Sequence, residues 1–270
     1  MSKFKEFILF LKDIWVNKSM LFKLSKNDIK SRYAGSFFGV VWAFIQPLVT
    51  IFVFWFVFQV GFRNPPVDNV EFILWLITGY LPWTYFSDGL MSSSGCLYEY
   101  GYLVKKVKFR TSLLPLVKIL SALFIHIFFI FFIWFMFLIY GHPFKLIWFQ
   151  SIYFSFCLTI LLIGMSWIMS SVSVFFKDFS QIVNIILQIG FWLTPVFWDA
   201  EKMATPFVNK ILKINPMYYI IQGYRDTFIN EYAIWHRQYI GLYFWAVTLV
   251  MFVFGAIIYR KLRPHFADVL

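Results

Sequence analysis

Few residues in this 270-residue sequence are arranged in a way that could carry chemistry. Its four histidines are scattered without metal-ligand spacing, and Cys96 and Cys157 lie far apart. The sequence contains no Gly-x-x-x-x-Gly-Lys-Ser/Thr motif, so it lacks the phosphate-binding loop of the P-loop ATPases. We therefore expect no catalytic residue, no metal site and no cofactor on this chain.

Ionisable side chains inside the apolar segments are also rare. Asp88 and His126 are the notable ones, whereas proton- or sodium-coupled transporters usually place several carboxylates at membrane depth. Asp88 suits either a structural or a gating role. Asp199 and Glu201 form an acidic pair that a membrane-embedded transferase could use, but two carboxylates are a weak case. An ion-coupled flippase and a transferase stay open as alternatives with little support.

Aromatic side chains are the chemistry that remains. A stripe at helical spacing runs through the first apolar segment, where it could pack against other helices or line a path: Phe44, Leu48, Ile51, Trp55, Phe58 and Phe62. Flat rings contact the C–H faces of sugars without demanding one hydrogen-bond pattern, so a sugar polymer could slide along them. The residues predicted to line such a path are Phe52, Trp55, Phe58, Trp83, Tyr85, Phe191, Trp192 and Trp198.

Helices in a membrane must position these residues. The chain is 61% apolar and only 14% charged, whereas soluble domains carry about 25% charged residues. A bilayer core about 30 Å thick requires about 20 mostly apolar residues per helix. Apolar runs of this kind cover residues 37–60, 70–93, 113–140, 147–174, 180–198 and 239–259. The sequence thus predicts an all-α integral membrane protein with six transmembrane helices.

The distribution of Lys and Arg predicts the orientation. With both termini in the cytoplasm, 17 of the 24 basic residues lie on the cytoplasmic side, where such residues are enriched. The net charge of +11 could also indicate nucleic-acid binding, but the basic residues gather beside the spans, where they meet anionic lipid headgroups. We expect membrane lipids, and no nucleic acid, as partners of these charges.

Three segments outside the spans are predicted to be organised. In residues 13–33, three lysines share one helical face, as in an N-terminal amphipathic helix that lies flat on the membrane surface. Residues 94–112 form the largest internal cytoplasmic link. After a break at Thr194–Pro195, Pro206 and Pro216 mark short re-entrant helices on the outer side before the last span. The predicted regions are a cytoplasmic interface region at 1–34, a transmembrane domain at 35–262 and a cytoplasmic tail at 263–270.

Several motifs resemble those of the ABC-2 type permeases, a family that exports lipid-linked cell-surface polymers. The first is DIKSRYAGSFFGVVWAFIQPL at 28–48, in which a charged helix end, a Gly-Ser pair and a Trp precede Pro-Leu. The next two are TGYLPWTYF at 78–86 and LVKKVKFRTSLLPL at 103–116, although Arg110–Thr111 stands where the family commonly has a proline nearby. The final blocks are FFKDFSQIVNIILQIGFWLTPVFW at 175–198, NPMYYIIQGYR at 215–225 and the tail KLRPHFADVL.

The resemblance implies a homodimer of six-span subunits in a bacterial cytoplasmic membrane, with the polymer path at the dimer interface. Two copies of a separate P-loop ATPase, which would hold ATP and magnesium, are implied on the cytoplasmic side. VDNVEF at 67–72 and LTPVFW at 193–198 look most like teichoic-acid permeases, so teichoic acid is the expected cargo and O-antigen the close alternative. The residues implied in coupling to the ATPase are Asp28, Arg32, Glu99, Tyr102, Lys105, Lys106 and Arg110.

Overall fold

Nearly all of the chain is helical in the computed structural model, which describes residues 16–63, 65–67, 70–105, 110–200 and 205–270. The larger helices are α3 (Trp42–Trp55), α4 (Phe72–Ser94), α7 (Leu114–Ile139), α8 (Gln150–Phe175), α9 (Phe179–Leu193) and α13 (Gln238–Leu262). The shorter helices are α2 (Lys18–Arg32), α5 (Cys96–Glu99), α6 (Gly101–Val104), α11 (Pro206–Leu212), α12 (Pro216–Arg225) and α14 (Phe266–Val269). Within the described ranges, the only β pairing is an isolated bridge between Val67 and Val70.

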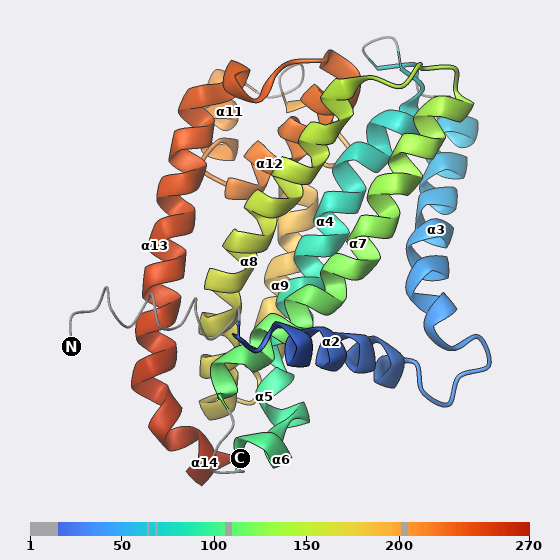
Figure 1. The fold of residues 1–270 in the computed structure, drawn as a ribbon. Coiled ribbons are helices and arrows are strands. Elements are labelled where there is room, and N and C mark those ends of the chain that lie inside the picture. Colours follow the sequence, from blue (N-terminus) through green and yellow to red (C-terminus); the bar gives the residue numbers. More distant parts are fainter. Residues whose placement is uncertain (1–15, 64, 68–69, 106–109, 201–204) are drawn as a thin grey trace.

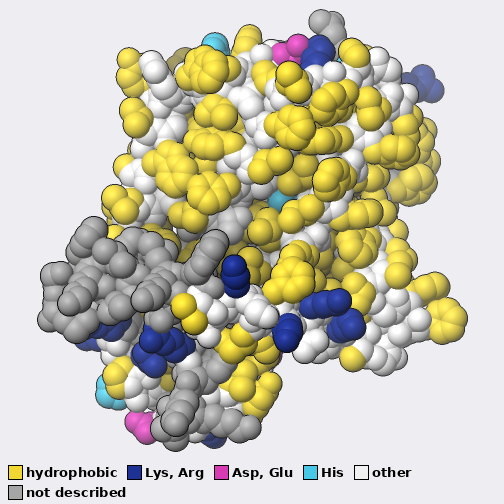
Figure 2. Space-filling view, in the orientation of Figure 1, with side chains coloured by type: hydrophobic (Ala, Val, Ile, Leu, Met, Phe, Trp, Pro, Cys, Tyr) yellow, Lys and Arg dark blue, Asp and Glu magenta, His cyan; other side chains and the backbone are white. Residues whose placement is uncertain are grey.

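The larger helices form an upright bundle (Figure 1). Helix α2 lies across one end of this bundle, near α5, α6 and α14, and we call this end the α2 end. Helices α11 and α12 lie toward the opposite end. Figure 2 shows apolar side chains over most of one face and Lys and Arg side chains gathered in a band toward the α2 end. Such a band beside an apolar belt is typical of the membrane boundary.

Four helical segments are long and apolar enough to cross a bilayer: Gly39–Gly61, Thr111–Ile139, Leu146–Phe175 and Ile234–His265. They coincide with four of the six predicted spans, and 3-10 or π turns at their ends contribute to their length. The all-helical prediction is therefore confirmed for the described residues. The other two predicted spans correspond to α4 and α9, which differ from the four in composition or length.

Helix α4 lies at the centre of the bundle, in contact with α7, α8, α9 and α12. Eighteen of its 23 residues are buried. Thr78, Ser87 and Asp88 make it more polar than the neighbouring helices, and this is tolerable because its side chains contact protein on nearly all sides. Its length of 23 residues corresponds to about 35 Å at 1.5 Å per residue, enough to cross a bilayer.

Helix α9 has 15 residues, so it is about 22 Å long and shorter than a bilayer core. It ends at Leu193 because Thr194, which precedes Pro195, adopts an extended conformation with ψ of 138°. A residue before proline is biased toward such a conformation. The break predicted at Thr194–Pro195 is thus present, and the predicted span at 180–198 is shorter than expected.

Two glycines allow α8 and α13 to approach closely. A Cβ atom on Gly164 would lie 2.8 Å from the backbone of Phe252, and one on Gly255 would lie 2.2 Å from the carbonyl oxygen of Gly164. No larger residue fits at either position without moving a backbone. Small residues at the contact between membrane helices permit this kind of packing, which supplies close van der Waals contact where lipid offers no hydrophobic driving force.

Helix α2 matches most of the amphipathic segment predicted at 13–33; residues 1–15 lie outside the described part. Leu21, Ser25 and Asp28 are buried, and the lysines at 23, 26 and 30 are exposed on the other side of the helix. Ser25 donates a hydrogen bond to the carbonyl of Val117, at 3.2 Å, and Ser121 donates one to the carbonyl of Ser25, at 3.1 Å. These contacts hold α2 directly against α7.

Helices α11 and α12 begin at the two prolines that the sequence singles out. Thr205 precedes Pro206 and accepts a hydrogen bond from the amide of Val208, and Asn215 precedes Pro216 and accepts one from the amide of Met217. Proline at the first helical position and a polar cap before it are the usual start of a helix. Short helices before the last span are therefore present; that they are re-entrant stays a prediction.

Candidate functional site

A cluster of charged and polar side chains lies at the α2 end, and we call it the α2 cluster. Its members are Asp28, Arg32, Asp88, Glu99, Tyr100 and Lys118. Asp28 is at its centre, because Arg32 donates to one carboxylate oxygen at 3.1 Å and Lys118 and Tyr100 donate to the other at 2.5 and 3.0 Å. The cluster joins α2 to α4, the α5–α6 segment and α7, which begin 40 or more residues after α2 ends.

Lys118 is the side chain that the sequence analysis missed as a site residue. It is one of the 17 basic residues that the predicted orientation places on the cytoplasmic side, yet the side chains of Lys118 and Asp28 are each only 1% exposed. Lys118 also forms an ion pair with Glu99, whose side chain is 57% exposed. A buried lysine requires a partner, so its position one turn inside an apolar helix was the signal that could have identified it.

The charges of the α2 cluster stabilise each other. Burial alone would raise the pKa of Asp28, but the positive charge of Arg32 and the hydrogen bond from Lys118 outweigh it and hold the pKa below its ordinary value. Burial and the neighbouring Asp28 carboxylate raise the pKa of the Tyr100 hydroxyl, which therefore stays protonated and donates its hydrogen bond. Asp28 is thus a carboxylate held in a fixed position between two helices.

Arg32 connects α2 to α4 as well. One of its terminal nitrogens lies 3.3 Å from both carboxylate oxygens of Asp88. The side chain of Asp88 is half-exposed, so this ion pair is weaker than the buried pair of Lys118 and Asp28. Asp88 was expected to be structural or to gate a path, and the structure brings it to the boundary between the α2 cluster and a cavity.

The structure brings only some of the predicted coupling residues together. Asp28, Arg32 and Glu99 belong to the α2 cluster, whereas Tyr102 and Lys105 lie beyond it with exposed side chains. The ring of Tyr102 contacts that of Tyr100, with 6.5 Å between centroids. Arg110 is exposed at the start of the segment that leads into α7, and Lys106 lies outside the described residues.

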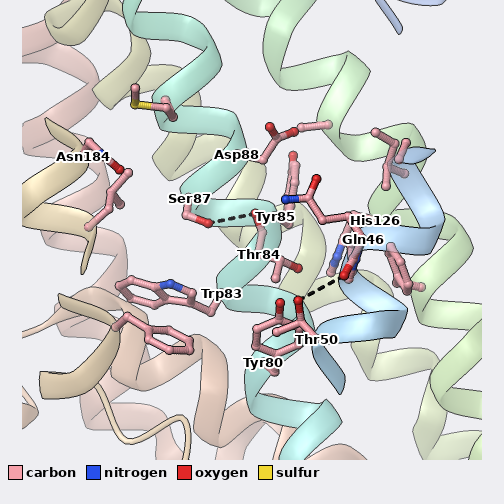
Figure 3. A pocket seen from close by; sticks show the side chains of 18 of the residues that line it. Gln46, Thr50, Tyr80, Trp83, Thr84, Tyr85, Ser87, Asp88, His126 and Asn184 are labelled. Atoms are coloured by element: carbon pink, nitrogen blue, oxygen red, sulfur yellow. Dashed lines mark hydrogen bonds between the residues drawn. The ribbon is translucent and has the colours of Figure 1, made fainter. Parts of the chain in front are cut away.

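A cavity of about 460 Å³ lies between α3, α4, α7 and α9 (Figure 3). Amides line it at Gln46, Asn184 and Gln188, and hydroxyls line it at Thr50 and Thr84. The aromatic residues that line it include Tyr80, Trp83, Tyr85 and Phe191. Asp88 also lines it, as does Tyr33, the residue that directly follows α2. A second cavity of about 560 Å³, between α8, α13 and residues 214–216, is lined almost entirely by apolar side chains. Of these two cavities, the first is the more polar, and it lies between helices that the sequence predicts to cross the membrane.

A buried hydrogen-bonded network supports one wall of the first cavity. The Tyr224 hydroxyl lies 2.8 Å from Nε2 of His126 and 2.6 Å from the hydroxyl of Ser155. The His126 ring stacks on Tyr85 with 4.6 Å between centroids, and the Tyr85 hydroxyl lies 2.9 Å from that of Thr159. These contacts hold Tyr85 and His126 in place. His126 is thus a packed, hydrogen-bonded residue, and among the described residues no group of His, Cys, Asp and Glu could hold a metal ion.

The residues predicted to line a path fall into three groups. Trp83, Tyr85 and Phe191 line the cavity. Trp55 and Phe58 pack against the core as part of the aromatic stripe, and Trp198 donates a hydrogen bond to the carbonyl of Trp192 at 3.1 Å. Phe52 and Trp192 are 60% and 62% exposed and point away from the core. Thr50 lines the cavity two residues before the exposed Phe52, and Phe191 lines it immediately before the exposed Trp192. The spacing of aromatic residues alone could not tell which face of each helix borders the cavity.

Comparisons with known proteins bear on what this arrangement does. A family model described as ABC-2 type transporter matches residues 20–229, from α2 through α12 and most of the π turn that follows. This chain belongs to the ABC-2 type transporter family. The match includes the α2 cluster and every residue that lines the polar cavity.

Three relatives extend the likeness over almost the whole chain. An O-antigen export system permease protein RfbA of Klebsiella pneumoniae is 28% identical over 253 residues, which are 93% of this chain and 95% of that protein. A second protein of that description from Klebsiella pneumoniae is 26% identical over 252 residues, with 93% and 95% covered. The protein of that description from Myxococcus xanthus is 24% identical over 267 residues, with 97% and 99% covered.

Proposed function

We propose that this ABC-2 permease is the transmembrane subunit of an ATP-driven exporter that moves a lipid-linked cell-surface polysaccharide across a bacterial cytoplasmic membrane. The observation that carries the proposal is its likeness to O-antigen export permeases over more than nine tenths of the chain. The cavity supports it, because amides, hydroxyls and rings together suit a chain of sugars. The expectation of teichoic acid remains a prediction that the relatives do not specifically support.

The exposed apolar faces support a homodimer. Only 11% of the apolar stretch in Gly39–Gly61 is buried, whereas half of the corresponding stretch in Leu146–Phe175 is buried. Helix α9 likewise exposes Ile182, Ile186 and Ile189. Helices α3 and α9 border the polar cavity, so a second copy placed against them would enclose it and complete a path between the subunits. We propose six crossings per subunit, in which the buried helix α4 and the shorter, largely exposed helix α9 are the other two.

The α2 cluster supports a coupling role for the α2 end. The sequence holds no P-loop, so ATP and magnesium would bind two copies of a separate ATPase subunit. The α5–α6 segment presents Glu99 and Tyr102, which are exposed, beside the buried pair of Lys118 and Asp28. A movement of α5 by the ATPase would pass through Lys118 to α7 and through Asp28 to α2. In this proposal the α2 end, the ATPase and both termini lie in the cytoplasm, in agreement with the orientation that the Lys and Arg residues predict.

The proposal is tested by purifying the chain alone and with the P-loop ATPase subunit of its source organism. Both preparations are reconstituted in liposomes that contain a polyprenyl-diphosphate-linked oligosaccharide. We expect ATP hydrolysis and ATP-dependent movement of the oligosaccharide only when both subunits are present. Hydrolysis by the permease alone, or a complex that hydrolyses ATP without moving the oligosaccharide, would contradict the proposal.

A further inference from the structure

The polar cavity has an unusual charge for a path that crosses a membrane. Asp88 is the only charged residue among the described residues that line it, and it carries a negative charge. Its ion-pair partner Arg32 belongs to α2 and does not line the cavity. Lys118, the one lysine of α7, is buried against Asp28 and Glu99 and does not line the cavity.

Three of the four helices that border the cavity, α3, α4 and α9, contain no Lys or Arg, and the fourth, α7, contains only Lys118, which is buried in the α2 cluster. Residues 33–62, which include α3, contain no Asp, Glu, Lys or Arg, and neither do residues 179–198, which include α9. Asp88 is the only such residue within α4. A second subunit that placed the same two helices against the cavity would therefore add no cation to it. The surroundings of a polymer in this path would remain neutral or slightly negative.

This charge distribution discriminates between two classes of polymer. A polyol-phosphate chain carries one negative charge on each phosphodiester, and sites that conduct phosphate or other anions are lined by Arg and Lys. In a region of low dielectric, an anion without a cation partner is disfavoured, and the Asp88 carboxylate, which pairs with Arg32, offers it no attraction. A lipid-linked neutral sugar chain meets this barrier once, at the diphosphate of its lipid anchor, whereas a polyol-phosphate chain meets it at every repeat.

The uncharged groups of the cavity match neutral sugars in detail. The amides of Gln46, Asn184 and Gln188 each offer both a donor and an acceptor, as do the hydroxyls of Thr50 and Thr84. Sugar hydroxyls also donate and accept, so many orientations of a moving sugar ring would be satisfied. Trp83, from α4, offers a flat apolar face to the same cavity (Figure 3).

We infer that the cargo is an uncharged, hydroxyl-rich sugar polymer and that this subunit discriminates against phosphodiester-linked polymers by the lack of cations in its path. The inference rests on the proposed export function and makes it more specific. It favours a polysaccharide over the teichoic acid that the sequence motifs favoured. The residues that set the discrimination are Gln46, Asn184, Gln188 and Asp88.

The inference is tested with the complete complex, permease and ATPase, in proteoliposomes. Two polyprenyl-diphosphate-linked probes of equal length are compared, one a neutral mannose oligomer and the other a glycerol phosphate oligomer. We expect ATP-dependent movement of the mannose oligomer to be at least tenfold faster. The variant Gln188→Lys, which places a cation in the cavity, should reduce this ratio several-fold by accelerating the glycerol phosphate oligomer. The matched control is Gln181→Lys, on an exposed position of the same helix outside the cavity.

Each outcome has a defined meaning. Equal or faster movement of the glycerol phosphate oligomer by the unmodified complex overturns the inference and leaves the export function standing. Movement of neither probe by a complex that hydrolyses ATP overturns the proposed function, and the inference falls with it. An unchanged ratio in Gln188→Lys, with a single symmetric peak in size-exclusion chromatography, shows that the cavity does not set the discrimination and also overturns the inference.

Discussion

Lys118 illustrates how one side chain can hold three parts of a membrane protein together. Its ammonium group pairs with Asp28 of α2 and with Glu99 of α5, while its backbone belongs to α7. Asp28 and Lys118 are both almost fully buried, so neither can be solvated by water if the other is lost. Removing one partner of an isolated buried ion pair typically costs about 3 to 5 kcal/mol, but here Arg32 and Tyr100 would still donate to Asp28, so the expected cost is smaller.

Replacing Lys118 with methionine, which is similar in length but uncharged, should therefore destabilise the protein by about 1 to 3 kcal/mol, the cost of a buried polar group that loses one of its partners. The melting temperature in detergent, followed by fluorescence-detected size-exclusion chromatography, should fall clearly below that of the control Lys23→Met, which changes an exposed lysine of α2. The double variant Asp28→Asn with Lys118→Met should recover part of the loss, since it removes both charges. Equal melting temperatures for Lys118→Met and Lys23→Met would contradict the burial of the pair.

Asp88 provides a contrast, because its ion pair with Arg32 is open to solvent on one side. Exposed ion pairs contribute about 0 to 1 kcal/mol, so Asp88→Asn should change stability by no more than about 1 kcal/mol. Transport should respond more strongly than stability, because Asp88 lies where α2 meets the cavity. Measuring both the melting temperature and ATP-dependent transport of Asp88→Asn separates the two effects; a loss of stability as large as that of Lys118→Met would contradict the prediction.

The α5–α6 segment is the element through which the ATPase is expected to act. Glu99 is its charged contact and Tyr102 its exposed aromatic side chain, and both lie at the α2 end. The pair of short helices is separated by Tyr100, whose hydroxyl donates to Asp28 at 3.0 Å. A partner that binds this segment would therefore act on a joint that is already tied to α2.

The double variant Glu99→Ala with Tyr102→Ala should weaken binding of the ATPase by about 1 to 3 kcal/mol, since it removes a charged contact and an aromatic anchor. Co-purification of the ATPase should fall while the permease still inserts into the membrane. The control is Tyr140→Ala, an exposed tyrosine that follows the far end of α7. Full co-purification and full transport in the double variant would remove this segment from the coupling mechanism.

The close contact of α8 with α13 depends on Gly164 and Gly255. We therefore expect a larger side chain at either position to push the two helices apart and lower the stability of the protein. Gly255→Val would force its side chain against the carbonyl oxygen of Gly164, which a Cβ atom alone would approach to 2.2 Å. Overpacking of this kind costs about 1 to 3 kcal/mol or more. The melting temperature should fall for Gly255→Val but not for Ala256→Val, the adjacent exposed position. Equal stability of the two variants would show that α13 does not rest on this contact.

The molecule as a whole is polarised by its basic residues. Figure 2 shows Lys and Arg in a band near the α2 end, and the positive-inside rule places such a band in the cytoplasm. Cys96 and Cys157 are buried, so replacing both with alanine gives a background for labelling. In this background, Lys105→Cys should react with an impermeant maleimide only from the cytoplasmic side and Lys210→Cys only from the outside. The reverse pattern would invert the orientation.

Sequence patterns predicted the positions of the helices better than the burial of individual side chains. Apolar runs located the large helices, and Thr194–Pro195 located the end of α9, because both depend on local properties of the chain. Burial depends on neighbours that are distant in sequence. Lys118 therefore looked like a flanking charge although Asp28 and Glu99 enclose it, and Phe52 looked like a cavity residue although Gln46 and Thr50 face the cavity from the same helix.

The unequal exposure of the two carboxylates that share Lys118 has a consequence for evolution. Asp28 is enclosed, so replacement of Lys118 by an uncharged residue costs least when position 28 changes with it. Glu99 can turn to water and survive such a change. An alignment of homologous permeases should therefore show strong covariation between positions 28 and 118, and much weaker covariation between 99 and 118.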